Sequence, residues 1–375
     1  KANLRLDRAD GVDGAYRAHD GSTAIKPGSL KESQLWYRIT TDDVDDVMPP
    51  PNARKKPLSK KEQAIIKSWI EAGAPYERFW AFVPARKSKT PRVKDRKWSR
   101  QPIDHYVLAK LESLGLRPSR EADRRTLIRR VTFDLTGLPP TLDEIKAFLA
   151  DDRPKAYEAL VDRLLARKQY GEHVARYWLD LVRFADTNGM HKDFYRNFIA
   201  YRDWVIRAFN DNLGYDDFVR YQLAGDLFPK ATNDQLVASG FSRLHLIIDR
   251  GTALPEESFF KNVVDRVTAV GTTFMGMTVH CATCHEHKYD PLTQKDFYSL
   301  FAFFNNIDAA PETNGRPKNG LQPPFLALGT PEQHRNLQQL DKQVAVSLKA
   351  LKALKTKVAA EKDPQKKKAF ARELK

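Results

Sequence analysis

Apolar side chains recur every three or four residues through most of the chain between residues 101 and 308, which is the period of a helix that buries one face. Strand signals are scarce, and the best is the short run "LHLII" at 244–248. We therefore predict a mainly α-helical fold. The helical period is found in residues 102–116, 141–152, 156–167, 173–186, 200–210 and 215–227.

Two predicted helices also carry start signals. Ser59 with Glu62, and Thr141 with Glu144, have the spacing of a capping box, in which each side chain bonds the backbone N–H of the other residue. The helix that follows Ser59 should end near Gly73. Its predicted buried face is Ile65, Ile66, Trp69 and Ile70, and that of residues 102–116 is Ile103, Val107, Leu108 and Leu111.

Composition divides the chain into five segments. Residues 1–78 are rich in turns and end in the helix after Ser59. Residues 79–100 read as a basic, proline-containing linker, and residues 101–308 as a larger helical domain. Residues 309–330 form a Pro- and Gly-rich spacer, and residues 331–375 form a lysine-rich helical segment.

The last segment carries a seven-residue repeat. Such a repeat is typical of a coiled coil or a helical hairpin, and it would allow a helix-mediated oligomer. A helix that packs on its own domain fits the same pattern, and Ser347 interrupts the apolar positions. Leu337, Val344, Leu351 and Val358 recur every seven residues, with Leu340 and Leu354 at the companion positions.

The net charge of +15 raises the question of nucleic acid. Much of the excess lies in residues 85–100, in residues 122–130 and in the lysine-rich end, and no base-reading motif accompanies it. We therefore expect no nucleic-acid partner. An acidic redox partner protein or an anionic extracellular polysaccharide suits the charge better. No apolar run has the roughly 18 residues of a membrane-spanning helix.

The chemically most distinctive stretch is "HCATCHEHKYDP", residues 280–291, which contains both cysteines and three of the nine histidines. C-x-x-C-H is the attachment signature of c-type haem. In this interpretation Cys281 and Cys284 form the thioethers and His285 is the proximal iron ligand. His287 is too close to reach the opposite face of the same haem, so we assign it a supporting or propionate-binding role, or a ligand role towards another group.

Two other interpretations remain open from the residues alone. Cys281, Cys284, His285 and His287 could supply four zinc ligands, although structural zinc sites usually draw ligand pairs from separated segments. The five-residue pattern could also arise by chance. Two cysteines three residues apart cannot organise a fold of this size through disulfides.

Many blocks of the chain resemble one family, the planctomycete-type cytochrome domain of large secreted proteins. The family carries C-x-x-C-H followed by a second His, a Lys and Asp-Pro, as residues 281–291 do. The resemblance implies a secreted haem-binding domain. The blocks, between residues 79 and 307, are "FWAFVP", "PIDHYVLAKLESLGLRPS", "EADRRTLIRRVTFDLTGLPPT", "YGEHVARYWLDLVRFADTNG", "YRDWVIRAFN", "QLAGDL" and "CATCHEHKYDPLTQKDFYSLFAFFNN".

The N-terminal segment resembles the C-terminal part of a small cytochrome c module. In such modules a loop Met ligates the distal side of the iron and a helix follows, and "VMPPP" with the helix after Ser59 has this order. The resemblance implies that Met48 is the distal ligand of another haem. We expect the C-x-x-C-H for that haem to lie upstream of Lys1.

For the distal side of the haem at His285, the candidates are Met190 and His191, in a loop far enough from the motif to fold over it. Met275 and Met277 precede the motif closely and should line the core or an apolar wall. His280 adjoins Cys281 and is too close to cross the ring.

We therefore predict a periplasmic, extracellular or cell-surface c-type cytochrome-like protein that carries covalent haem c and transfers electrons. The first alternative is a haem-dependent oxidoreductase acting on a saccharide or polymer, with carboxylates beside the haem. The second is a zinc-stabilised or metal-free interaction module. The carboxylates considered for a catalytic cleft are Asp180, Asp186, Asp226, Asp249 and Asp265.

Overall fold

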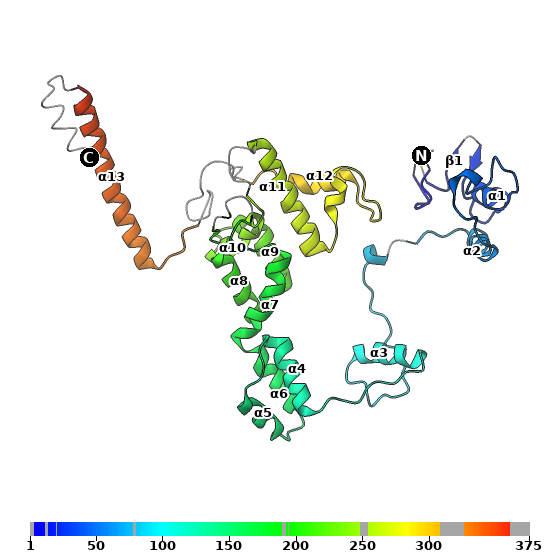
Figure 1. The fold of residues 1–375 in the computed structure, drawn as a ribbon, viewed down its shortest axis with the longest axis horizontal. Coiled ribbons are helices and arrows are strands. Elements are labelled where there is room, and N and C mark those ends of the chain that lie inside the picture. The colour runs from blue at the N-terminus through cyan, green and yellow to red at the C-terminus, as the bar shows by residue number, and fades with distance from the viewer. Residues whose placement is uncertain are drawn as a thin grey trace. The chain divides into compact units, whose positions relative to one another are not determined.

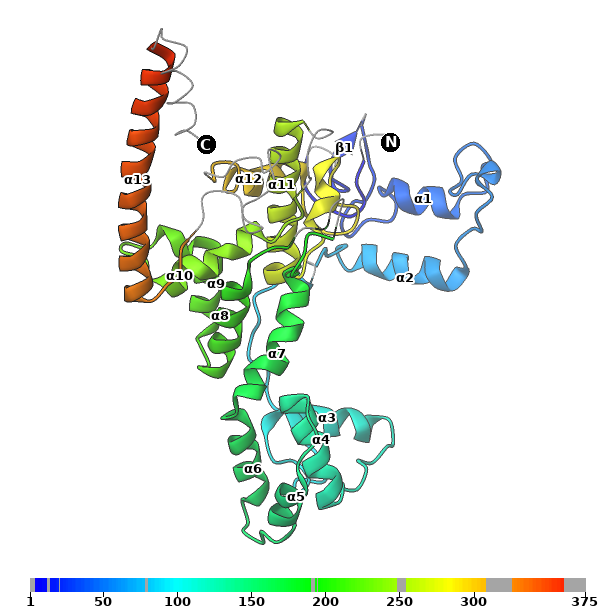
Figure 2. The same cartoon turned by 60° about the vertical axis from the view of Figure 1, so that its left-hand side comes forward.

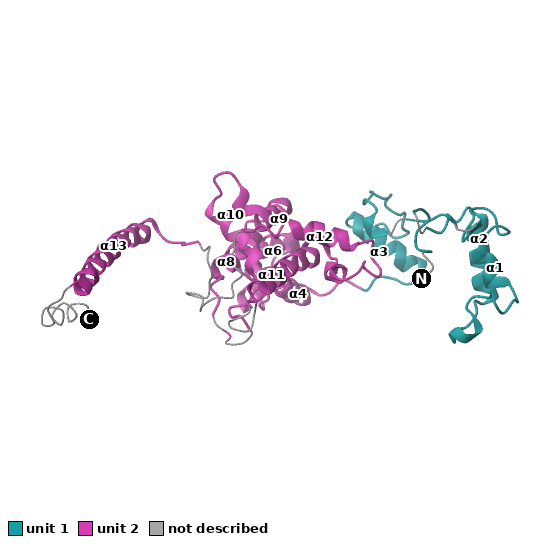
Figure 3. Cartoon of the chain, turned by 90° about the horizontal axis from the view of Figure 1, so that it is seen from above, with its two compact units in different colours: residues 1–119 teal, residues 120–375 magenta. Residues whose placement is uncertain are grey.

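The computed structural model describes residues 4–11, 14–19, 21–77, 80–189, 193, 195–247, 254–307 and 326–360. The chain divides into two compact units, residues 1–119 and 120–375 (Figure 3). The described chain as a whole is mainly helical, which confirms the predicted fold class, and its helices are concentrated in unit 2. Within the described ranges, the strands are β1 (Ala18–His19) and β2 (Ser22–Thr23), which form one antiparallel hairpin.

The helices of both units are coloured along the chain in Figure 1. Unit 1 contains α1 (Gln34–Thr40), the 3-10 turn η1 (Pro51–Ala53), α2 (Lys60–Glu71), η2 (Trp80–Phe82) and α3 (Pro102–Ser113). Unit 2 begins with α4 (Arg124–Thr136), α5 (Leu142–Leu149), α6 (Ala156–Leu165), α7 (Lys168–Leu181), α8 (Ile199–Asn210), α9 (Tyr215–Ala224) and η3 (Gly225–Leu227). It continues with α10 (Asn233–Ala238), η4 (Ser239–Arg243), α11 (Pro255–Val270), η5 (Gly271–Met275), η6 (Val279–Thr283), α12 (Gln294–Ala302) and α13 (Pro331–Ala360).

A small core holds the first part of unit 1 together. Ile25 and Ile70 are almost completely buried, and the ring of Tyr76 packs edge-on against Tyr16 and Trp69. The hydroxyl of Tyr16 also donates to the backbone carbonyl of Ala74, which ties the end of α2 to the N-terminal turns.

The start and end of α2 are as predicted, but its buried face is narrower. Both halves of the Ser59–Glu62 capping box are present, and the helix ends just before Gly73, whose φ is +93°. Ile66, Trp69 and Ile70 pack into the core, whereas Ile65 is 63% exposed. The prediction for Ile65 was wrong because it lies about 100° around the helix from Ile66, outside the stripe that covers this small core.

The predicted face of α3 is corrected in the same way. Leu108 is 2% exposed, whereas Ile103 and Val107 are 66% and 48% exposed. Only the stripe through Leu108 is covered by the rest of unit 1, so the other two apolar side chains lie at the surface.

Unit 2 contains two cores, and the smaller one lies between α4, α5 and α6 (Figure 1). Ile128 on α4 and Leu160 and Leu164 on α6 are buried there. The predicted Thr141–Glu144 capping box is present at the start of α5.

The larger core is formed mainly by α7, α8, α9 and α11, and α7 lies along α8 (Figure 2). The rings of Trp204 and Phe218 stack at 5.3 Å between centroids. Gly171 permits the close approach of α7 to α8, because an added Cβ would lie 2.4 Å from the carbonyl oxygen of Ile206. The backbone N–H of Gly171 donates to Asn210 at 2.8 Å.

The best strand signal of the sequence, at 244–248, gives no strand over its described residues, which are irregular. Their backbone is held by buried side chains instead of a neighbouring strand. Asn188 exchanges two hydrogen bonds with Ile247, at 2.7 and 2.9 Å. Arg196 donates to the carbonyls of Arg243 and His245, each at 2.7 Å.

His245 is 1% exposed and lies within this network. The guanidinium of Arg266 donates to His245 Nε2 at 3.2 Å, and Nδ1 donates to the carbonyl of Leu246 at 3.1 Å. The ring is therefore neutral, because a second proton would face Arg266. Burial, and then the charge of Arg266, lower the pKa of His245 well below its usual value.

This network predicts a specific loss of stability in acid. Below the unfolded-state pKa of about 6.5, the unfolded chain binds a proton that folded His245 does not, so the free energy of unfolding falls as the pH falls. The slope from this group is at most about 1.4 kcal/mol per pH unit. Urea unfolding followed by tryptophan fluorescence, between about pH 7.5 and 5, should show a smaller slope for His245→Gln than for wild type. The same change at the exposed His280 is the control, and equal slopes for wild type and His245→Gln would contradict the assignment.

Candidate functional site

The C-x-x-C-H motif lies on a compact turn between α11 and α12. The helix α11 runs directly into the π-helical turn η5, which ends at Gly276 with a φ of +63°. η6 then carries the first cysteine. Gly271 lets η5 approach η6, because an added Cβ would lie 2.5 Å from a methyl carbon of Val279. The sequence thus brings η6 back against the end of α11.

The 3-10 period of η6 separates the motif into an inner and an outer face. Residues three apart lie on the same side of a 3-10 helix. Val279 and Ala282 are 4% and 1% exposed and face the core. Cys281 and Cys284, also three apart, are both free thiols at the surface. The C-x-x-C spacing therefore leaves both sulfurs exposed.

The backbone between the two cysteines is held by α12. The carbonyl oxygen of Thr283 accepts hydrogen bonds from Gln294 Nε2 at 3.0 Å and from the Tyr298 hydroxyl at 3.1 Å. The hydroxyl of Thr283 donates to the carbonyl of His280 at 2.8 Å. The two contacts from α12 fix the shape of the turn from outside the motif, and no local signal in the sequence predicts them.

His285 is exposed and has one ring nitrogen available. Its Nδ1 lies 2.7 Å from the carbonyl oxygen of Glu286. Because the partner is a carbonyl, Nδ1 carries the proton and Nε2 keeps its lone pair. Histidines that ligate metals typically donate their other ring N–H in this way.

His287 has a different environment. Its side chain is 7% exposed, and Nδ1 accepts the backbone N–H groups of Tyr289 and Asp290 at 3.2 and 2.8 Å. Nε2 donates to the hydroxyl of Thr278 at 3.0 Å. Both ring nitrogens are therefore used to close the turn after the motif, and its predicted role towards a haem stays a prediction.

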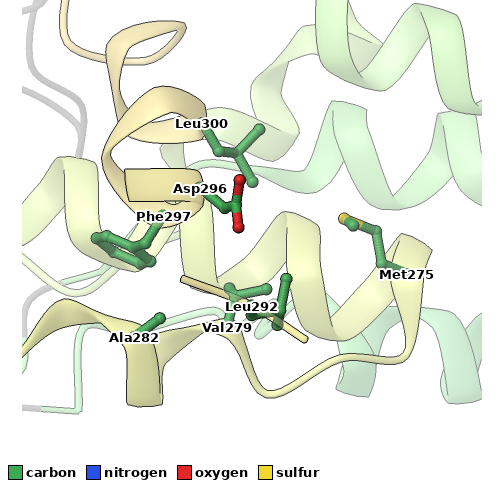
Figure 4. A pocket seen from close by; sticks show the side chains of 7 residues that line it. All are labelled: Met275, Val279, Ala282, Leu292, Asp296, Phe297 and Leu300. Atoms are coloured by element: carbon green, nitrogen blue, oxygen red, sulfur yellow. The ribbon is translucent and has the colours of Figure 1, made fainter. Parts of the chain in front are cut away.

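An apolar cavity of about 200 Å³ lies beside the motif. Side chains of η6 and α12 face each other across it (Figure 4). Among the described lining residues, Asp296 alone is charged, and its carboxylate accepts the Thr293 N–H and hydroxyl at 2.9 and 2.7 Å. These bonds lower the pKa of Asp296. The lining residues are Met275, Val279, Ala282, Leu292, Asp296, Phe297 and Leu300.

The methionines and histidine that the sequence suggested as haem ligands or as an apolar wall do not all line this cavity. Met275 lines it and Met277 packs on the larger core, as expected. Met190 and His191 lie outside the described residues. Met48 belongs to unit 1, where its side chain is 43% exposed and its N–H donates to the carbonyl of Arg38.

The carboxylates considered for a catalytic cleft are exposed or paired where the structure describes them. Asp265 pairs with Arg183, and Asp180, Asp186 and Asp226 are exposed. Asp249 lies outside the described residues. In the part of the chain that the structure describes, no three His, Cys, Asp or Glu side chains are arranged to hold a metal ion. The zinc interpretation therefore has no preassembled site there.

The residues present fit a covalently attached haem. Both thiols are exposed, one within η6 and one directly after it, and among the described residues the adjacent His285 has no partner for Nε2. The apolar cavity is smaller than the roughly 300–1,000 Å³ typical of small-molecule pockets, so it would receive only an edge of a macrocycle.

Two family models match parts of the chain. Residues 1–52 match the family model described as Planctomycete cytochrome C, so the N-terminal segment is cytochrome c-like. Residues 102–309, more than half of the chain, match the family described as Protein of unknown function (DUF1549), PSCyt2, and the chain belongs to that family. The resemblance found in the sequence is thereby confirmed. Neither a curated protein nor a solved structure matches the chain. Across the described ranges, no helix could span a membrane.

We predict that His287→Ala loosens the turn without unfolding unit 2. Removing a buried ring that makes three hydrogen bonds should lower the free energy of unfolding by about 1–2 kcal/mol, and amide hydrogen exchange should accelerate in residues 287–292. His280→Ala removes an exposed ring with one longer contact, to Thr268 at 3.3 Å, and is the matched control. Unchanged exchange in residues 287–292 would show that His287 does not hold the turn.

Proposed function

We propose that this chain binds haem c covalently through Cys281 and Cys284, with His285 as the proximal iron ligand, and transfers electrons. The observation that carries the proposal is the exposed placement of both thiols, one within the 3-10 turn η6 and one directly after it. A haem bound there would supply a one-electron iron centre. Every group needed to hold it from the proximal side comes from residues 281–285.

The surrounding residues would restrict the turn and exclude water from one side of it. Gln294 and Tyr298 hold the carbonyl of Thr283, so the two thiols keep their spacing. Met275, Phe297 and Leu300 offer apolar surface beside the turn. The Asp296 carboxylate accepts the Thr293 N–H at the N-terminus of α12. The other described lining residues are apolar.

The proposal extends to the second module and to partners. Met48 would be the distal ligand of a haem in the N-terminal cytochrome module, since its thioether is half-exposed. The net charge of +15 favours an acidic redox partner, with anionic polysaccharide as the alternative of the same charge. The family match to a cytochrome c module supports a periplasmic or cell-surface location, where c-type haem is attached.

An oxidoreductase acting on a saccharide or other polymer is a weaker candidate. It needs acid–base groups near the haem, and the described carboxylates considered for that role are exposed or paired. The zinc or metal-free module is weaker still, because both nitrogens of His287 are occupied within the chain.

Variants of the motif test the proposal. Protein exported through a haem-maturation pathway should carry the added mass of one haem at residues 281–284, and Cys281→Ala with Cys284→Ala should lose it while far-ultraviolet circular dichroism stays helical. His285→Ala should keep the thioethers but change the visible spectrum, because the iron loses its proximal ligand. The exposed His280→Ala is the control. A wild-type peptide of unmodified mass after such maturation would refute haem attachment.

A further inference from the structure

The helix α13 presents an apolar stripe whose side chains are exposed or partly exposed. It runs unbroken over 30 residues (Figure 2), about 45 Å at 1.5 Å per residue. None of its side chains is buried among the described residues. Leu340, Val344 and Leu348 are 55–59% exposed. An exposed row of large aliphatic side chains marks an interaction surface.

The spacing of the stripe is that of a two-stranded coiled coil. In heptad notation, Leu337, Val344, Leu351 and Val358 occupy the a positions. Leu340, Ser347 and Leu354 occupy the d positions. Core-facing a and d side chains at this period pack against a second helix of the same kind, so the helix itself supplies a complementary partner.

The charges on α13 distinguish between the two orientations of such a pair. Residues 331–345 contain two acidic and two basic side chains, whereas residues 346–360 contain four lysines and no acidic side chain. A parallel pair would place the two basic halves side by side, which is unfavourable. An antiparallel pair places each basic half beside a neutral one.

One antiparallel register also pairs the apolar layers. It sets Leu340 against Val358 of the second copy and Val344 against Leu354 of the second copy. Ser347 then meets Leu351 of the second copy, so the small polar residue faces a large apolar one. In this register Asp341 and Lys355, both at e positions, face each other between the copies, and Leu348 meets its own counterpart at the centre.

We propose that α13 forms an antiparallel coiled coil with α13 of a second copy of this chain, in this register. The pairing joins two haem-binding domains into one dimer, and it does not depend on whether haem is bound. The partner is identified by the a/d pattern, the largely exposed stripe and the opposite charges of Asp341 and Lys355.

Charge reversal tests the orientation. Sedimentation equilibrium of the full chain at low salt should show a monomer–dimer equilibrium. Asp341→Lys or Lys355→Asp alone should weaken dimerisation roughly tenfold, because each turns two attractive contacts into repulsive ones. Together the two changes should restore wild-type affinity. Lys349→Asp makes the same charge change at an outward f position and is the matched control, with helix content followed by circular dichroism.

Two outcomes would overturn the proposal. One is a wild-type chain that stays monomeric at every concentration, which would place the stripe on its own chain or on another partner. The other is a double variant whose dimerisation is no stronger than that of the single variants, since residues 341 and 355 lie far apart in a parallel pair and could not compensate each other.

Discussion

The carbonyl oxygen of Thr283 accepts two hydrogen bonds from α12, and the geometry of the candidate site depends on them. These hydrogen bonds restrict the backbone between the cysteines. Val279 and Ala282 of the same 3-10 turn are buried in the larger core. A turn held in this way keeps Cys281 and Cys284 exposed. A tetrahedral zinc site would instead need the thiols and both histidines to converge, and His287 is held elsewhere.

A second constraint stabilises the scaffold behind this turn. Arg266 lies on α11, the helix that leads into the motif, and it donates to the carbonyl of Ser242 at 2.8 Å and to His245. Buried polar groups of this kind are costly unless each is paired, so the network favours one arrangement of the backbone over others. The position of α11, and with it the start of η5 and η6, is thereby linked to the irregular segment at 244–247.

The helices and the motif could be predicted from the sequence because their signals are local. Capping boxes at Ser59 and Thr141 and the 3.6-residue period were sufficient for most elements. The strand signal at 244–248 was misleading because the partners of that backbone, Asn188 and Arg196, lie 59 and 49 residues away. The hydrogen bonds of Gln294 and Tyr298 to Thr283 could not be predicted for the same reason. The start of their helix could have been, because Thr293 and Asp296 form a capping box. The buried faces of α2 and α3 were overestimated because the period gives the direction of a face and not the size of the core it meets.

The account rests on one chemical claim, that the exposed turn at residues 281–285 carries a covalent haem. The most direct test is a pyridine haemochrome spectrum of the purified full chain, exported through a haem-maturation pathway and extracted with acidified organic solvent to remove non-covalent haem. We predict a c-type haemochrome band that stays with the polypeptide, one haem of which is lost when Cys281 and Cys284 are both changed to Ala. Colourless polypeptide, with all haem in the solvent or none present, would contradict the account.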